Sequence, residues 1–214
     1  LTGQIVGQSA GFVSANIHSP ISGTVVNVDM FPNGQGQRRM MVVIKREGDE
    51  WLETIDRTPD HKRECTLEPK EIIAKIKDAG IVGLGGAQFP THVKLTIPEG
   101  QKAEVLIING VECEPYLTSD YRNMLERAEM MLTGVEILMR ALNVERAVIG
   151  VENNKPDAIA HLEEVIARDN YRGIEVMPLK MRYPQGGEKQ LIAAVTGRQV
   201  APPPALPISE GVVV

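Results

Sequence analysis

Residues 80–95, GIVGLGGAQFPTHVKL, hold four glycines within seven positions, followed by Phe-Pro-Thr and a lysine. Glycine adopts positive φ values and lets a ligand lie against the bare backbone. Successive backbone N–H groups in such a loop form a concave anion site, and a nearby lysine adds positive charge. A helix end followed by a loose surface loop is the alternative, and a run of glycines alone would favour it. The flanking sequence decides between the two.

Downstream of this glycine loop, apolar runs alternate with helical patterns. The expected strands are residues 103–109, 146–152 and 173–179, and the expected helices are 120–142, 156–169 (capped by Asn154) and 187–196 (ended by Gly197). Alternating strands and helices predict a parallel sheet with right-handed crossovers. Ligands on such sheets gather beyond the carboxyl ends of the strands.

Upstream, a helix is expected at residues 69–79, with Pro69 in its first turn and Gly80 as its stop. Residues 58–68 are polar and are expected to be a connector. Residues 1–57 contain short Val and Ile runs broken by Ser-Pro and Ser-Gly turns, with a hairpin expected between 40–47 and 51–55. Their pattern resembles the half-barrels of lipoyl and biotinyl carrier domains, but the hairpin tip has no lysine to carry a prosthetic group.

Composition excludes several classes of function. The 214 residues are 43% hydrophobic and 24% charged, as in an ordinary globular protein, and the net charge of −5 without a basic block argues against nucleic-acid binding. No apolar run is long enough to span a membrane. The two cysteines, Cys65 and Cys113, cannot hold an iron–sulfur cluster, which takes four ligands. His61 and Glu64 lie near Cys65, but their spacing matches no common metal site.

Three loops are expected to meet at one rim of the sheet. The second is NGVECEP (109–115), after the first strand, and the third is YPQGGEK (183–189), after the third strand. Singly, each has a plainer interpretation as a turn or a solvated charged loop. Together they predict a pocket in which backbone amides and Lys94 hold a phosphate, Asn109 and two glutamates bond hydroxyls or ring nitrogens, and Tyr183 stacks on a flat ring. Such a pocket suits a nucleotide or a flavin.

These motifs carry a family resemblance. GLGGAQFPTHVKL resembles the GxGGAGFPTxxK motif of the FMN- and NADH-binding subunit of respiratory complex I, and NGVECEPYLTSDYR resembles that family's second flavin loop. YPQGGEKQLI is typical of a narrower family, the C subunit of the Rnf complex, a membrane-bound, ion-translocating electron-transport complex. The resemblance covers essentially the whole chain. The cobalamin reductase of bacterial microcompartments shares these modules and is the near alternative.

The resemblance implies an α/β fold. A Rossmann-like parallel sheet with flanking helices would occupy residues 58–200, after a partial barrel-sandwich hybrid at 1–57 and before a linker and the start of a truncated domain at 201–214. It implies electron entry from NADH through FMN, and 4Fe-4S clusters in the full-length protein only. The partners would be other subunits of the membrane complex, at the cytoplasmic face of the bacterial inner membrane, with no membrane span in this chain.

The resemblance also assigns cofactor-binding residues. These are Gly83, Gly85, Gly86, Ala87 and Lys94 toward FMN, Asn109, Glu112 and Glu114 toward its ribityl chain and ring, Tyr183, Gly186 and Glu188 near the flavin and nicotinamide, and Phe89 on the adenine side. No catalytic side chain or metal ligand is implied. Gln88 stands where the motif has glycine, and this fragment is expected to lack FMN even if the full protein uses it. A docking module of the complex and some other nucleotide-binding protein are the competing functions.

Overall fold

The computed structural model describes residues 1–59, 61–85 and 87–214. The chain divides into two compact units, one made of Leu1–Asp60 and Lys75–Val93, the other of His61–Ala74 and Lys94–Val214. The domain boundaries expected after residues 57 and 200 stay a prediction. Residues 201–214 lie within the second unit.

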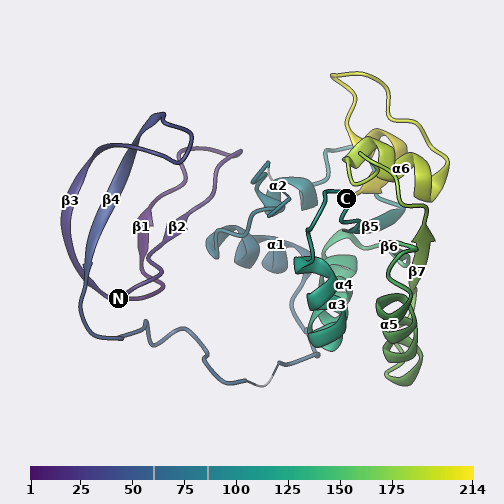
Figure 1. Cartoon of the computed structure of the whole chain (residues 1–214), viewed down its shortest axis with the longest axis horizontal. Coiled ribbons are helices and arrows are strands. Elements are labelled where there is room, and N and C mark those ends of the chain that lie inside the picture. Colours follow the sequence, from purple (N-terminus) through teal and green to yellow (C-terminus); the bar gives the residue numbers. More distant parts are fainter. Residues whose placement is uncertain (60, 86) are drawn as a thin grey trace. The chain divides into compact units, whose positions relative to one another are not determined.

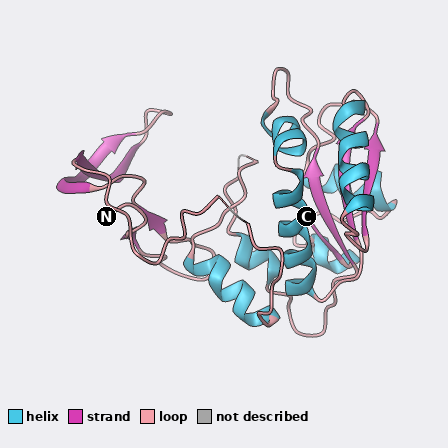
Figure 2. Cartoon of the chain, turned by 90° about the horizontal axis from the view of Figure 1, so that it is seen from below, coloured by secondary structure: helices cyan, strands magenta, loops and turns pink. Residues whose placement is uncertain are grey.

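The second unit is built on a four-stranded parallel sheet in the order β7-β6-β5-β8 (Figures 1 and 2). The strands are β5 (Val105–Gly110), β6 (Ala147–Glu152), β7 (Ile174–Leu179) and β8 (Val212–Val213). The first three lie where the apolar runs predicted them, which confirms the α/β class with a parallel sheet. The apolar run at the end of the chain does form a strand, and it pairs with β5 at the edge of this sheet.

The helices of this unit are α3 (Ser119–Glu126), α4 (Ala128–Leu142), α5 (Pro156–Arg168) and α6 (Glu188–Thr196), with a 3-10 turn at Pro207–Glu210. The single helix predicted at 120–142 is wrong, because Arg127, with φ −137° and ψ 32°, leaves the helical region and separates α3 from α4. The predicted Asn154 cap is also wrong, since Lys155 occupies the cap position of α5. Gly197 ends α6 in the left-handed conformation, as predicted.

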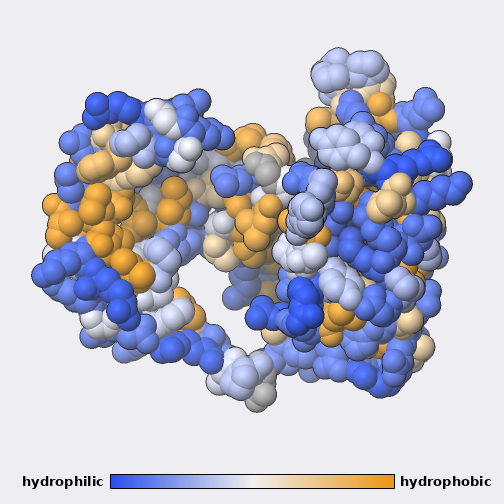
Figure 3. Space-filling model, viewed as in Figure 1, coloured by the Kyte–Doolittle hydropathy of each residue, from blue (hydrophilic) through white to orange (hydrophobic). Residues whose placement is uncertain are grey.

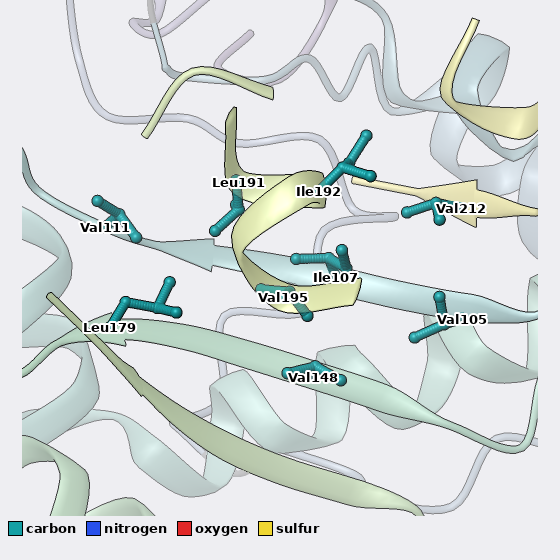
Figure 4. Close-up of a cluster of buried hydrophobic side chains, with 9 residues drawn as sticks. All are labelled: Val105, Ile107, Val111, Val148, Leu179, Leu191, Ile192, Val195 and Val212. Carbon is teal, nitrogen blue, oxygen red and sulfur yellow. The ribbon is translucent and has the colours of Figure 1, made fainter. Parts of the chain in front are cut away.

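The core of the second unit is aliphatic. Every residue of β6 is buried, as expected for a strand of a parallel sheet covered on both faces. Figure 4 shows α6 lying over β5 and β6. The side chains that meet there are Val105, Ile107, Val111, Val148, Leu179, Leu191, Ile192, Val195 and Val212. Burying each such side chain stabilises the fold by about 1.5–3 kcal/mol.

The first unit contains two antiparallel pairs of strands, β1 (Ile5–Gly7) with β2 (Ile17–His18), and β3 (Gly23–Pro32) with β4 (Arg38–Arg46). The predicted hairpin between 40–47 and 51–55 is wrong, because β4 pairs with β3 along its length. The Asn33 carboxamide oxygen accepts hydrogen bonds from the backbone N–H groups of Gln35 and Gln37, which closes the β3–β4 turn. Trp51 instead pairs with Thr2 in an isolated parallel bridge. Figure 3 shows apolar residues at the surface of the β3–β4 hairpin.

Two further helices flank the glycine loop along the sequence, α1 (Pro69–Asp78) and α2 (Thr91–Leu95). As predicted, α1 begins at Pro69 and ends just before Gly80. The spacing of Ile72, Ile73 and Ile76 on α1 predicts an apolar face; Ile72 and Ile76 are buried and Ile73 is partly buried. Within the described part of the chain, no helix is both long and apolar enough to cross a bilayer.

Candidate functional site

The glycine loop belongs to the first unit and is closed at its base by backbone hydrogen bonds. The N–H of Gly83 donates to the carbonyl of Phe89 at 2.9 Å, and the N–H of Thr91 donates to the carbonyl of Ile81 at 3.1 Å. A pocket of about 580 Å³ lies against this loop within the same unit, and Ala87 and Phe89 are among its lining residues. Gly86, the remaining predicted residue of this loop, lies outside the described residues.

Neither packing nor backbone conformation accounts for glycine at positions 83 and 85. Neither residue has a positive φ. A Cβ added at Gly83 would meet only the Phe89 carbonyl oxygen, at 3.8 Å, and one added at Gly85 would meet no described atom within 4 Å. The fold of the described residues would therefore tolerate side chains here. The open space at these two positions leaves the bare backbone accessible, so the loop is compatible with close approach of a bound group.

Position 88 holds glutamine where the related motif has glycine, and the backbone conformation there is one that favours glycine. Gln88 has a φ of 51°, in the left-handed region that glycine adopts at least cost. The glutamine therefore occupies a backbone position for which glycine is better suited. This explains why the related motif has glycine there.

The second and third predicted loops meet in the second unit. The side-chain amide of Asn109 donates from Nδ2 to the Gly186 carbonyl at 2.9 Å, while its Oδ1 accepts from the Val111 N–H at 3.1 Å. A Cβ at Gly186 would lie 3.2 Å from the Cys113 Sγ and 3.2 Å from the Val111 carbonyl oxygen. Asn109 and the absence of a side chain at Gly186 thus hold the two loops in close contact.

Replacing this asparagine tests the connection. We expect Asn109→Ala to lower the free energy of unfolding by about 1–2 kcal/mol, because the Gly186 carbonyl and the Val111 N–H both lose a partner. Urea unfolding measures the difference. Asn154→Ala is the matched control, because Asn154 makes a side-chain contact only with the Met181 sulfur among the described residues. Equal effects of the two substitutions would contradict a tie between the loops.

The side chain of Glu112, which precedes α3 in the sequence, caps the N-terminus of that helix. Its Oε1 accepts hydrogen bonds from the backbone N–H groups of Asp120 at 2.6 Å and Tyr121 at 3.2 Å, in the first turn of α3. Thr118, at the N-cap position, makes no side-chain cap bond. A carboxylate at this place satisfies free N–H groups and interacts favourably with the helix dipole. Glu112 therefore fixes the start of α3 to the loop after β5.

Glu112 also belongs to a buried charge cluster. The Lys155 ammonium lies 3.1 Å from Oε2 of Glu112 and 3.4 Å from Oε2 of Glu152. The side chains of the two glutamates are 0% and 1% exposed, and that of Lys155 is 11% exposed. Glu152 Oε1 is buried and has no hydrogen-bond partner among the described residues. Partial burial and the charge of Glu112 raise the pKa of the nearby Asp120 carboxyl, and the charge of Lys155 partly offsets this.

Lys94 and Glu188 also come together in the second unit. Lys94 Nζ donates to the Val214 carbonyl at 2.8 Å and lies 3.4 Å from Glu188 Oε1. Glu114 is exposed, and Tyr183 is 77% exposed. The structure thus brings together the second and third predicted loops, and it places Lys94 beside Glu188 of the third loop. The meeting of the glycine loop with them stays a prediction, because that loop lies in the other unit.

Sequence reasoning missed Glu152 and Lys155. The available signal was the glutamate that ends the apolar run of β6, at the same carboxyl edge as the loop after β5. Among the described residues, no group of three or more His, Cys, Asp or Glu side chains is placed to hold a metal ion.

Comparison with known families defines the class of the chain. Residues 76–214 match the model of the Nuo51 FMN-binding domain, and residues 1–49 match that of the RnfC barrel sandwich hybrid domain. The chain belongs to the Nuo51 FMN-binding domain family. Over 99% of its length it is 49% identical to the C subunit of the Na⁺-translocating ferredoxin:NAD⁺ oxidoreductase complex of Acetobacterium woodii. It is 45% identical, also over 99% of its length, to the C subunit of the proton-translocating complex of Clostridium ljungdahlii.

These relatives confirm the resemblance to Rnf C subunits. The chain spans 47% and 45% of their respective lengths. A solved structure of similar fold is the NAD⁺-reducing [NiFe]-hydrogenase in its H₂-reduced state. It matches with a TM-score of 0.54 and 26% identity, over 67% of this chain and 27% of that one. The same hydrogenase in its air-oxidised state matches with a TM-score of 0.56 and 25% identity, over 69% of this chain and 28% of that one.

Proposed function

We propose that this chain binds FMN and receives electrons from NADH, within a subunit whose remaining part holds 4Fe-4S clusters. The observation that carries the proposal is the glycine loop, whose backbone at Gly83 and Gly85 is open to the close approach of a ligand, within the segment that matches the FMN-binding family. The match of residues 76–214 to an FMN-binding family supports the same assignment. Bound FMN would supply the redox chemistry, since a flavin exchanges a hydride with a nicotinamide and single electrons with iron–sulfur clusters.

The chain's own residues would bind and orient the cofactors. Backbone amides of the glycine loop would hold the FMN phosphate, and Lys94 would contribute a positive charge to its binding. The exposed Glu114 would accept hydrogen bonds from the ribityl chain. Glu112 is buried and fully engaged with α3 and Lys155, so its part would be to set the shape of the loop that carries Glu114. Tyr183 and Glu188 would lie near the flavin and the nicotinamide, with Phe89 near the adenine.

The wider role follows from the relatives. The complexes named for them translocate Na⁺ or protons and act on ferredoxin and NAD⁺. We propose that the full protein passes electrons onward in a complex of this kind, as a peripheral subunit on the cytoplasmic face of the membrane. Docking to other subunits is a second candidate function, favoured by the exposed valines of β3, which are Val25, Val26 and Val28.

A valine in the glycine loop tests the proposal. In the full-length protein, we expect Gly85→Val to weaken FMN binding by roughly tenfold or more, because branched methyl groups would occupy the space of a group packed on the backbone. The unfolding temperature should stay unchanged, since the added side chain meets no described atom. Quenching of FMN fluorescence on titration with apoprotein measures the affinity.

The matched control is Gly34→Val, in the turn between β3 and β4. This glycine also has a φ outside the left-handed region and open space around its Cβ. It should leave FMN affinity unchanged. If the unsubstituted full-length protein binds no FMN, the proposed function fails and docking becomes the better assignment.

A further inference from the structure

The β3–β4 hairpin is a sheet with one apolar face and one mixed face. Residues paired across an antiparallel ladder point to the same side, and successive pairs alternate between the two sides. The pairs on one face are Val28 with Val42, Met30 with Met40 and, beyond the irregularity in register, Val25 with Ile44. The pairs on the other face include polar or charged side chains, as in Asn27 with Val43, Asp29 with Met41 and Phe31 with Arg39.

The apolar face is open to solvent among the described residues. Five of its side chains are between 36% and 65% exposed, namely Val25, Val28, Met30, Met40 and Val42. They contribute to the apolar surface seen on the hairpin in Figure 3. The neighbouring strands of the first unit, β1 and β2, are three and two residues long, and Ile5 and Ile17 on them are exposed as well. Nothing described in this unit covers the apolar face.

Such a face needs a partner. A two-stranded hairpin is marginally stable in water, and it becomes stable when further strands join it or another layer packs on its apolar side. Soluble proteins rarely leave a contiguous apolar surface of this kind exposed, and long uncovered strands associate with other chains. The hairpin therefore requires a covering layer in the folded protein.

The remainder of the same polypeptide is the occupant that the observations favour. This chain spans 47% and 45% of the lengths of two related subunits, so more than half of each subunit lies outside the matched part. Residues 1–49 match a barrel sandwich hybrid domain, and in a sandwich two sheets pack face to face. A segment of the same polypeptide is also held at a high effective concentration near the hairpin.

The ends of the apolar face indicate the chemistry of its partner. Arg38 is paired with Pro32 and Arg46 with Gly23, so an arginine lies on this face at each end of the hairpin. An apolar layer with acidic residues at its two ends would match both the apolar centre and these charges.

We propose that the apolar face of the hairpin is the inner face of a two-layer β structure. Its second layer is a β segment of the same polypeptide outside residues 1–214, apolar at alternate positions and acidic at its ends. The inference does not depend on the binding of FMN or NADH. It places Val25 and Val28, which favour docking as a second candidate function, against the subunit's own chain, so the two assignments exclude each other.

Thiol labelling of the isolated full-length subunit tests the assignment. Val28→Cys should react with a maleimide at least about tenfold more slowly than the matched control Asp29→Cys, because the two neighbours point to opposite faces of the hairpin. Met40→Cys, opposite Met30 on the apolar face, should react as slowly as Val28→Cys. Mass spectrometry of the peptide that carries each substitution measures the rate separately from the protein's other cysteines.

Equal rates for Val28→Cys and Asp29→Cys in the isolated subunit would overturn the proposal. If Val28→Cys were then protected only in the assembled complex, the face would be a docking surface for another subunit. Protection that disappears on dilution would assign the face to a second copy of the chain and would also overturn the proposal. Protection in an isolated subunit that binds no FMN would support this inference and overturn only the proposed function.

Discussion

Lys155→Met should lower the free energy of unfolding by about 3–5 kcal/mol, the cost of leaving buried charges without a partner. The Lys155 ammonium lies between Glu112 and Glu152, whose side chains are essentially without exposed surface. Methionine has a similar length and fills similar space. The loss of stability would therefore come from the missing positive charge and not from a cavity. Removing the cation would leave two buried carboxylates near each other with no positive charge between them.

Urea unfolding of the single and double variants separates charge from packing. Adding Glu152→Gln to Lys155→Met should recover part of the lost stability, because it removes one of the two uncompensated charges. Lys189→Met is the matched control, since the Lys189 ammonium makes its only hydrogen bond among the described residues with the Ala201 carbonyl, at 2.7 Å. If Lys155→Met costs no more than this control, the cluster does not stabilise the fold.

This cluster shows where prediction from the sequence stopped. Glu112 was predicted to reach the flavin, because NGVECEPYLTSDYR resembles the family's second flavin loop, with a solvated loop charge as the alternative. Its burial depends on β5 and β6 lying side by side, with Gly110 opposite Val151 in register. That pairing places the residues after the two strands at one edge, where Lys155 meets both acids. Local spacing carries no information about such a pairing, so Lys155 went unnoticed.

The elements themselves were more predictable than their partners. Continuous apolar runs located β5, β6 and β7, because strands buried on both faces need apolar residues at successive positions. The hairpin in the first unit was predicted with the wrong partner. Residues 38–46 pair with 23–32 through the turn at Asn33, and not with 51–55 through the Gly48-Asp49 turn. The break at Arg127 has no glycine or proline to signal it in the sequence.

The glycines of residues 80–86 look alike in the sequence. Among those that the structure describes, however, the backbone conformation and the space for a side chain differ from one glycine to the next. Gly80 has a φ of 67°, and a Cβ there would lie 2.2 Å from the carbonyl oxygen of Asn16. Asn16 in turn donates from its side chain to the Asp78 carbonyl at the end of α1, at 3.3 Å. Gly80 is thus a structural glycine that lets two backbone segments of the first unit approach closely. Gly85 has neither a positive φ nor a neighbour among the described atoms.

We therefore expect Gly80→Ala to lower the free energy of unfolding by about 2–4 kcal/mol, since it combines a left-handed alanine with a clash against a backbone carbonyl that cannot rotate away. Gly85→Ala should change stability by less than about 0.5 kcal/mol, as substitutions at open surface positions do. Urea unfolding of the two variants measures the contrast. Because the first unit contains both residues, a similar loss for both would mean that the whole loop, and not Gly80 alone, supports the fold. In that case the absence of side chains at Gly83 and Gly85 would no longer point to a ligand.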